Sequence, residues 1–233
     1  MSSSQGQPRY RIAVDAMGGD YAPREAVQGA VDAARRGNVT VLLVGEPDAL
    51  KGELPLEVPP NLEVIPSEGV IAETEHPVEA LRRKPRASIA VAAGLVKAGR
   101  ADGYVSMGST GAAMAAGMMA LGTLDGVDRP ALGGPFLGLA PKTVVLDLGT
   151  NMDCRPSQLL DYGVLGSVVS RVFLGIQEPR VALLSVGAEE GKGNRQTRET
   201  YKLLQDSGLN FIGNVEGIDV PLGKADVVVC DGF

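Results

Sequence analysis

The chain has 233 residues, of which 44% are hydrophobic, and its formal net charge is -6. This length suits one large α/β domain or two small ones, and the acidic balance argues against nucleic acid as a main partner. Two cysteines without a C-x-x-C spacing and a single histidine, His76, exclude a cysteine-only zinc site and a histidine-rich metal site.

Strand and helix patterns alternate along most of the chain. Residues 1–9 lack an apolar run and are expected to be a disordered leader rather than a secretory signal. Buried strands are expected within 11–15, 39–47, 62–68, 101–107, 142–148, 180–186, 209–221 and 225–230. Helices are expected within 23–37, 76–101 (two, divided at Pro85), 108–122, 154–175 and 194–208. The alternation predicts a three-layer α/β/α fold with a largely parallel sheet.

No low-complexity linker interrupts this pattern, so residues 10–233 are expected to form a single α/β domain. Neither of the two most apolar windows is suited to span a membrane, because glycines break one and charged residues break the other. A cytoplasmic location is therefore expected.

Four expected strands end in glycine-containing loops with polar residues, and a fifth begins one. The loops are DAMGGD (15–20), SMGSTGA (106–112), DLGTN (147–151), SVGAEEGKGN (185–194) and CDGF (230–233). Because the carboxyl ends of parallel strands share one edge of a sheet, we expect these loops to form one crevice. Free N–H groups at such places bind anions, so the series favours a phosphate-type ligand over ordinary tight turns.

Three kinds of residue in these loops have both a structural and a functional interpretation. Ser109 and Thr110 are expected at a helix N-cap, where their hydroxyls and amides also suit a phosphate. Lys192 lies in a glycine-rich turn and is either a solvated lysine or a point charge for phosphate. Asp15, Asp20 and Asp147 end strands, where carboxylates commonly cap turns.

Several catalytic motifs are missing from the sequence. There is no P-loop, no G-x-G-x-x-G after the first strand and no G-x-S-x-G elbow. With one histidine in a loop, no Ser-His-Asp or Cys-His set can be assembled. An enzyme with this sequence is expected to work without a cofactor or a protein nucleophile, by positioning two substrates and stabilising charge.

Eight ordered motifs resemble the phosphate acyltransferase family PlsX, from about residue 10 to the last residue. They are RIAVDAMGGDYAP, RRKPRAS, SMGSTGA, GVDRPAL, VVLDLGTNMDCRP, LLSVGAEEGKGN, FIGNVEG and ADVVVCDGF. The resemblance implies a fold like that of isocitrate and isopropylmalate dehydrogenases. It also implies transfer of a fatty acyl group from acyl carrier protein to inorganic phosphate, giving acyl phosphate that a membrane acyltransferase uses in phospholipid synthesis.

The resemblance also sorts the candidate residues into roles. The candidate catalytic residues are Lys192, Asn151 and Asp231. The candidate substrate-binding residues, all in the loops at strand ends, are Asp15, Gly18, Gly19, Asp20, Ser109, Thr110, Gly111, Asn194 and Gly232. The basic cluster of Arg82, Arg83 and Lys84 is a candidate docking site for the acidic acyl carrier protein. Ser109 stands where the family pattern has Asn, so a contact there is expected to pass through water.

The resemblance further implies a homodimer and a family pattern that continues past Phe233, with later segments that associate with the membrane. We therefore expect strand 226–230 to lack a covering helix, and the 233-residue chain alone to be inactive and to associate through that strand. Two other functions stay open: a nicotinamide-dependent decarboxylating dehydrogenase of related fold, and a non-catalytic truncated remnant.

Overall fold

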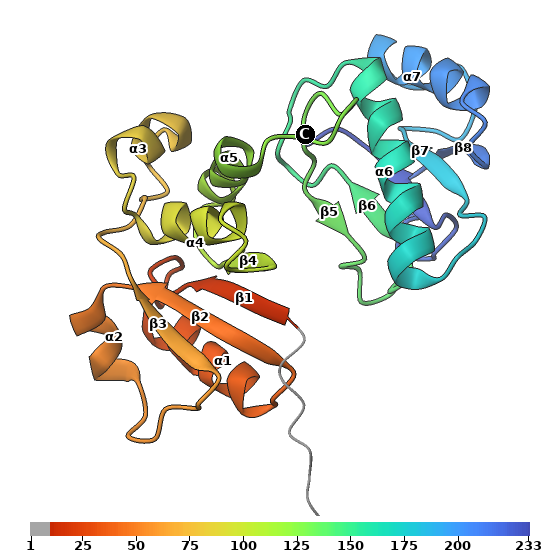
Figure 1. Cartoon of the computed structure of the whole chain (residues 1–233). Coiled ribbons are helices and arrows are strands. Elements are labelled where there is room, and N and C mark those ends of the chain that lie inside the picture. The colour runs from red at the N-terminus through yellow and green to blue at the C-terminus, as the bar shows by residue number, and fades with distance from the viewer. Residues whose placement is uncertain (1–9) are drawn as a thin grey trace, which may run out of the picture. The chain divides into compact units, whose positions relative to one another are not determined.

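The structure of the chain is a computed structural model that describes residues 10–233; the expected leader, residues 1–9, lies outside the described residues. Contacts divide the described chain into two compact units, residues 10–122 and residues 123–233 (Figure 1). The sequence pattern predicts one domain with one sheet for this stretch, whereas each unit has its own sheet.

Unit 1, residues 10–122, contains four parallel strands in the order β3-β2-β1-β4. Its strands are β1 (Tyr10–Asp15), β2 (Val39–Gly45), β3 (Leu62–Pro66) and β4 (Gly103–Ser106). Its helices are α1 (Arg24–Arg35), α2 (Pro47–Glu53), α3 (Pro77–Arg83), α4 (Ser88–Lys97) and α5 (Thr110–Leu121). Each of these except the short α2, whose one buried side chain is Leu50, is expected from the sequence.

Alternating side chains of β2 show how unit 1 is layered. Val41 and Leu43 pack in one cluster with α1, whereas Leu42 and Val44 pack on the other face of the sheet with α4. This two-residue period is what a strand buried on both faces requires. Helices on both faces of a parallel sheet confirm the predicted three-layer α/β/α architecture.

Unit 2, residues 123–233, contains a mixed sheet in the order β5-β6-β9-β7-β8. Its strands are β5 (Gly133–Gly134), β6 (Val144–Leu146), β7 (Val181–Leu184), β8 (Phe211–Val215) and β9 (Val227–Val229). Its helices are α6 (Pro156–Leu174) and α7 (Arg195–Asp206). Four strands are parallel, and only the two-residue β5, which the sequence pattern does not predict, runs antiparallel.

The last strand, β9, lies in the middle of this sheet. It pairs with β6 on one side and β7 on the other, and Val227, Val228 and Val229 are at most 1% exposed. Helix α6 packs on one of its faces, and Leu137 and Val220 cover the other. The expectation that strand 226–230 is uncovered and associates through its edge is therefore wrong, because both its edges and both its faces are occupied.

Two glycines of α6 explain how this helix approaches the sheet so closely. A Cβ on Gly166 would stand 2.4 Å from the Cγ1 of Val227, and a Cβ on Gly163 would stand 3.0 Å from the Cδ2 of Leu204. Larger residues at these positions would push α6 away from β9 and α7. Among the helices of residues 10–233, none combines the length and apolar character needed to cross a membrane.

Candidate active site

The ends of β1 and β4 lie side by side in unit 1. The chain leaves β1 toward β2 on one side, whereas β4 pairs with β1 on the other side. Strand order therefore reverses between β1 and β4, and open α/β sheets bind ligands outside the carboxyl ends of strands at such a reversal. The structure thus brings the predicted residues after β1 close to those after β4.

A chain of hydrogen bonds links the two strand ends. The Ser106 hydroxyl donates to Asp15 Oδ2 at 2.7 Å, and the Gly108 amide donates to the Ser106 hydroxyl at 3.1 Å. The Met17 amide donates to Asp15 Oδ1 at 3.2 Å. Asp15 is 2% exposed, so this buried carboxylate fixes both loops. Asp15 is one of the predicted substrate-binding residues. Its geometry suits a role in holding the loops in place rather than in binding phosphate, because its negative charge would repel a phosphate.

The N-terminus of α5 lies in the second of these loops. Ser109 is its N-cap, and the Ser109 hydroxyl accepts a hydrogen bond from the Ala112 amide at 3.3 Å. The first backbone bond of the helix runs from Ala113 to Ser109, so the Thr110 and Gly111 amides precede it and have no partner within the helix. Both residues are exposed. These N–H groups and the helix dipole suit an anion.

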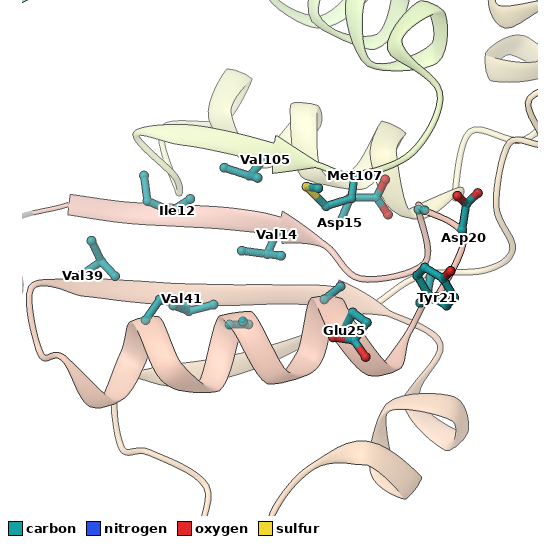
Figure 2. Close-up of a pocket in the computed structure, with 17 residues that line it drawn as sticks. Ile12, Val14, Asp15, Asp20, Tyr21, Glu25, Val39, Val41, Val105 and Met107 are labelled. Carbon is teal, nitrogen blue, oxygen red and sulfur yellow. The ribbon is translucent and has the colours of Figure 1, made fainter. Parts of the chain in front are cut away.

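A cavity of about 630 Å³ begins at the ends of β1 and β4 and follows α1 (Figure 2). Four predicted substrate-binding residues line it: Asp15, Gly18, Gly19 and Asp20. Most of its other walls are apolar side chains of β1, β2, β4 and α1. Figure 2 shows Asp15, Asp20, Tyr21 and Glu25 toward one end, and Ile12 and Val39 toward the other. The cavity thus has a polar mouth and an apolar interior.

In unit 2, the loop after β6 is organised around Asp147, which is 1% exposed. Its Oδ1 accepts hydrogen bonds from the Leu132 amide at 3.0 Å and the Thr150 hydroxyl at 2.8 Å. Its Oδ2 accepts bonds from the Asn151 amide at 2.7 Å and the Asn151 Nδ2 at 2.9 Å. Asp147 therefore caps its turn, as carboxylates at strand ends commonly do, and fixes the loop from 148 to 151.

The geometry of Asn151, a candidate catalytic residue, favours a positioning role. Its Nδ2 donates to both Asp147 Oδ2 and the Pro130 carbonyl, the latter at 2.9 Å, so both amide hydrogens are used. Its backbone carbonyl accepts a bond from the Gly232 amide at 2.8 Å. A Cβ on Gly232 would stand 2.9 Å from the Gly149 Cα. The DLGTN and CDGF loops therefore interlock, and only glycine fits at position 232.

Two predicted residues, Asn194 and Asp231, line a second cavity of about 490 Å³ in unit 2. Asn194 caps α7, since its Oδ1 accepts bonds from the Thr197 amide at 2.9 Å and the Thr197 hydroxyl at 3.1 Å. The Ser185 hydroxyl, which sequence analysis does not single out, also lines this cavity, and it is buried without a hydrogen-bond partner in the described chain. The cavity sits at the ends of β7 and β9.

The positively charged candidate residues differ in their exposure and in their ion pairs with nearby carboxylates. Lys192 is half-exposed, and its Nζ lies 3.9 Å from Glu189 Oε1. In the basic cluster, Lys84 Nζ lies 2.6 Å from Glu75 Oε2, and Arg83 lies 3.5 Å from Glu75 Oε1. Arg82 is exposed. Because two of its three cations face a carboxylate of the same unit, the cluster is less basic than its sequence indicates.

The two thiols are poor nucleophiles. Burial, followed by the Asp231 and Asp147 carboxylates, raises the pKa of Cys230 to about 12. Burial also raises the pKa of Cys154, whose Sγ contacts the Asn151 carbonyl at 3.3 Å. Since the thiolate is the reactive form, both cysteines are unreactive near neutral pH. Within residues 10–233, no group of three or more histidine, cysteine, aspartate or glutamate side chains could hold a metal ion.

Comparison with known proteins places the chain in a family. A family model described as "Fatty acid synthesis protein" matches residues 10–233. A phosphate acyltransferase of Desulfitobacterium hafniense is 50% identical over 225 residues, which cover 96% of this chain and 67% of the relative. This architecture and set of strand-end loops define an α/β protein with glycine-rich turns at the ends of its strands. The chain belongs to the phosphate acyltransferase family, which confirms the resemblance of its eight motifs.

Two solved structures share the fold. A phosphotransacetylase from Streptococcus pyogenes matches with a TM-score of 0.65 and 18% identity, covering 96% of this chain and 78% of that protein. A 4-hydroxythreonine-4-phosphate dehydrogenase from Burkholderia phymatum matches with a TM-score of 0.52 and 18% identity, covering 94% and 79%. At this identity the likeness concerns the fold alone, and it agrees with the dehydrogenase-like architecture predicted from the motifs.

Proposed function

We propose that the chain transfers a fatty acyl group from acyl carrier protein to inorganic phosphate. The acyl phosphate formed would supply phospholipid synthesis through a membrane acyltransferase. Membership of the phosphate acyltransferase family supports acyl transfer to phosphate. The observation in the structure that carries the proposal is the exposed N-terminus of α5, where the Thr110 and Gly111 amides suit a phosphate.

The proposed reaction needs no nucleophile from the protein. A phosphate oxygen attacks the thioester carbonyl carbon, a C–O bond forms, and the C–S bond breaks. The sulfur leaves as a thiolate and takes up the proton that the hydrogen phosphate gives up. Phosphate is already nucleophilic and the thiol is a good leaving group, so positioning and charge stabilisation supply the rate. The raised pKa values of Cys154 and Cys230 agree with a route that uses neither thiol.

The roles of individual residues follow from their geometry. In unit 1, Asp15 and Ser106 hold the two glycine-rich loops in place, and the amides that begin α5 bind the phosphate. In unit 2, Lys192 supplies a mobile positive charge for an anionic substrate, while Asp147 and Asn151 fix the loop that contacts Gly232. Asp231 borders the cavity near Asn194.

A homodimer is part of the proposal. Helix α6 exposes Val164, Val168 and Val172, which recur every four residues and therefore lie on one face. Such an apolar stripe suits a second copy of the chain. Sedimentation of the purified chain is expected to give a dimer, and Val168→Glu is expected to give a monomer. A wild-type chain that sediments as a monomer at all concentrations would remove this part of the proposal.

The decisive experiment is an assay with purified chain, acyl carrier protein loaded with a fatty acyl group, and phosphate. Acyl phosphate is trapped with hydroxylamine and quantified as the hydroxamate. Because β9 is paired on both edges and buried, the main reason for expecting an inactive chain does not hold, and the expected result is product that requires the chain, the thioester and phosphate together. A folded chain that forms no acyl phosphate at any phosphate concentration would overturn the proposal for these residues.

A further inference from the structure

One face of the sheet in unit 1 is covered only in part. Helix α1 packs over β2, but on the same side of the sheet Val105 of β4 is 48% exposed and Met107 beyond it is 72% exposed. Ile12 and Val14 of β1 are half-buried on this face. These apolar side chains form the floor of the cavity of about 630 Å³ shown in Figure 2. This volume lies in the range typical of small-molecule sites.

The wall of the cavity is the flank of α1, which beyond Glu25 at the mouth presents small residues. Ala26, Gly29 and Ala33 are three and four positions apart, so they share one face of the helix. A Cβ on Gly29 would meet nothing within 4 Å. The groove between α1 and β4 therefore keeps open space beside an apolar floor for about two helical turns, roughly 10 Å.

The groove is continuous with the candidate active site. Asp15, Gly18 and Gly19, which follow β1 at the reversal of strand order, also line its mouth. Asp20 and Glu25 add carboxylates at this end, whereas Ile12 and Val39 lie at the other end. An occupant must therefore have a long apolar part and an end group that tolerates negative charge around it.

We propose that this groove holds the hydrocarbon chain of the fatty acyl substrate, with the thioester at the polar mouth. The inference rests on the proposed function and adds to it the place and the chemistry of acyl-chain binding. The carboxylates at the mouth repel the carboxylate of a free fatty acid but not a neutral thioester, so they select the thioester. Each methylene that enters the groove strengthens binding roughly fourfold, until the groove is full.

The test measures binding directly, without turnover. The 233-residue chain is irradiated with a decanoyl thioester, whose length matches that of the groove, carrying a diazirine near the end of its hydrocarbon chain, and the labelled peptides are identified by mass spectrometry. Label on Ile12, Ala33 and Val39, which line the cavity away from its polar mouth, is expected, with competition by unlabelled decanoyl thioester and far weaker competition by a butanoyl thioester. Label that falls elsewhere overturns the proposal.

Two matched variants make the test specific. Gly29→Leu fills the groove and is expected to reduce labelling at least tenfold. Gly52→Leu adds the same side chain in α2, outside the groove, where a Cβ also meets nothing within 4 Å, and is expected to label normally. Circular dichroism checks that both variants fold, and Ala26→Leu replaces Gly29→Leu if the latter does not.

Equal labelling of a folded Gly29→Leu variant and the wild type overturns the proposal. That result would favour a packed polypeptide helix as the occupant of the groove. The outcome is separable from that of the proposed function. If a chain that forms no acyl phosphate is still labelled specifically in the groove, the proposal of acyl-chain binding stands and the proposed transfer reaction is wrong. If acyl phosphate forms but the label falls elsewhere, the proposed transfer reaction stands and the groove is not the acyl-chain site.

Discussion

Gly18 and Gly108 approach each other so closely that a Cβ on Gly18 would stand 2.9 Å from the Gly108 amide nitrogen. The same Cβ would lie 2.7 Å from Asp15 Oδ2, the oxygen that binds the Ser106 hydroxyl. The loop after β1 and the loop after β4 are therefore built as one piece, and any side chain at position 18 separates them. Because α5 begins two residues after Gly108, this contact also sets where its amides point.

The first prediction concerns Gly18→Ala. The added methyl group displaces the Gly108 backbone and breaks the Asp15–Ser106 hydrogen bond, so we expect a loss of about 1–3 kcal/mol of stability. We also expect phosphate binding to weaken at least tenfold, as measured by calorimetric titration. Gly52→Ala, at a position where a Cβ meets no atom within 4 Å, serves as the control. Wild-type phosphate affinity in folded Gly18→Ala would show that this turn is only a connection.

The second prediction concerns Lys192→Ala. Its ion pair with Glu189 spans 3.9 Å and both side chains are at least half-exposed, so the pair holds Lys192 weakly and leaves it free to meet a substrate. We expect the KM for phosphate to rise about tenfold, with little change in the free energy of unfolding. Initial rates over a range of phosphate concentrations measure this effect.

Lys202→Ala is the matched control for Lys192, because Lys202 is an exposed lysine farther along α7. It is expected to keep the wild-type KM. If Lys192→Ala and Lys202→Ala both give the same dependence of rate on phosphate as the wild type, Lys192 does not bind phosphate. It is then a solvated lysine of the loop, the other interpretation that the sequence allows.

The third prediction concerns the buried hub at Asp147. Asp147→Ala removes the acceptor of the Thr150 and Asn151 amides, and one of the two acceptors of the Leu132 amide and the Asn151 side chain, so we expect a loss of about 3 kcal/mol or more. Urea denaturation measures the change. Glu199→Ala removes an exposed carboxylate of α7 that pairs with the exposed Arg195 and is expected to cost about 1 kcal/mol or less. Equal effects of the two variants would contradict the central position of Asp147.

Much of this fold is predictable because its signals are local. Pro23 before α1 and Gly37 after it mark helix boundaries by their backbone preferences, and the structure places α1 between them. The glycine-rich loops follow directly from buried strands, so their position at strand ends is fixed once the strands are recognised. The prediction that these loops bind an anion uses the same observation, since a helix begins in the loop after β4 and in the loop after β7.

Other features depend on pairings between distant residues, which local patterns do not contain. The place of β9 between β6 and β7 is set by pairing across more than 40 residues. The partners of Asp147 include the Leu132 amide, 15 residues earlier, and the groove joins Gly29 to Val105. The sequence shows the cations at 82–84 but not that the Glu75 carboxylate pairs with Lys84, which requires the folded chain.

The fourth prediction concerns three residues to which the mechanism gives no role. His76→Ala and Cys154→Ala are expected to retain most acyl transfer activity, and Cys230→Ala to retain it as well. His76 is exposed in the loop before α3, and both thiols have a raised pKa. A hundredfold loss in kcat/KM, about 2.7 kcal/mol, in a folded variant would reveal a general acid or a thiol step that the geometry does not indicate.

The fifth prediction is a pH dependence of stability that comes from Cys230. Its pKa rises from 9.0 to about 12 in the folded chain, first because of burial and then because of the Asp231 and Asp147 carboxylates. Above pH 9 the unfolded chain releases a proton that the folded chain keeps, so unfolding is favoured as pH rises. The contribution of Cys230 to stability is therefore complete below pH 9 and falls between about pH 9 and 12.

Comparison of the wild type with Cys230→Ala isolates this effect from the titration of tyrosines and lysines. The difference in unfolding free energy between the two proteins, from urea denaturation under reducing conditions, is expected to change by about 1 kcal/mol between about pH 8.5 and 10, to the disadvantage of the wild type. A difference that stays constant over this range would mean that the Cys230 thiol ionises equally in the folded and unfolded chains. The packing around Cys230 at the end of β9 would then be looser than the contact between its Sγ and the Asp147 carbonyl, 3.1 Å, indicates.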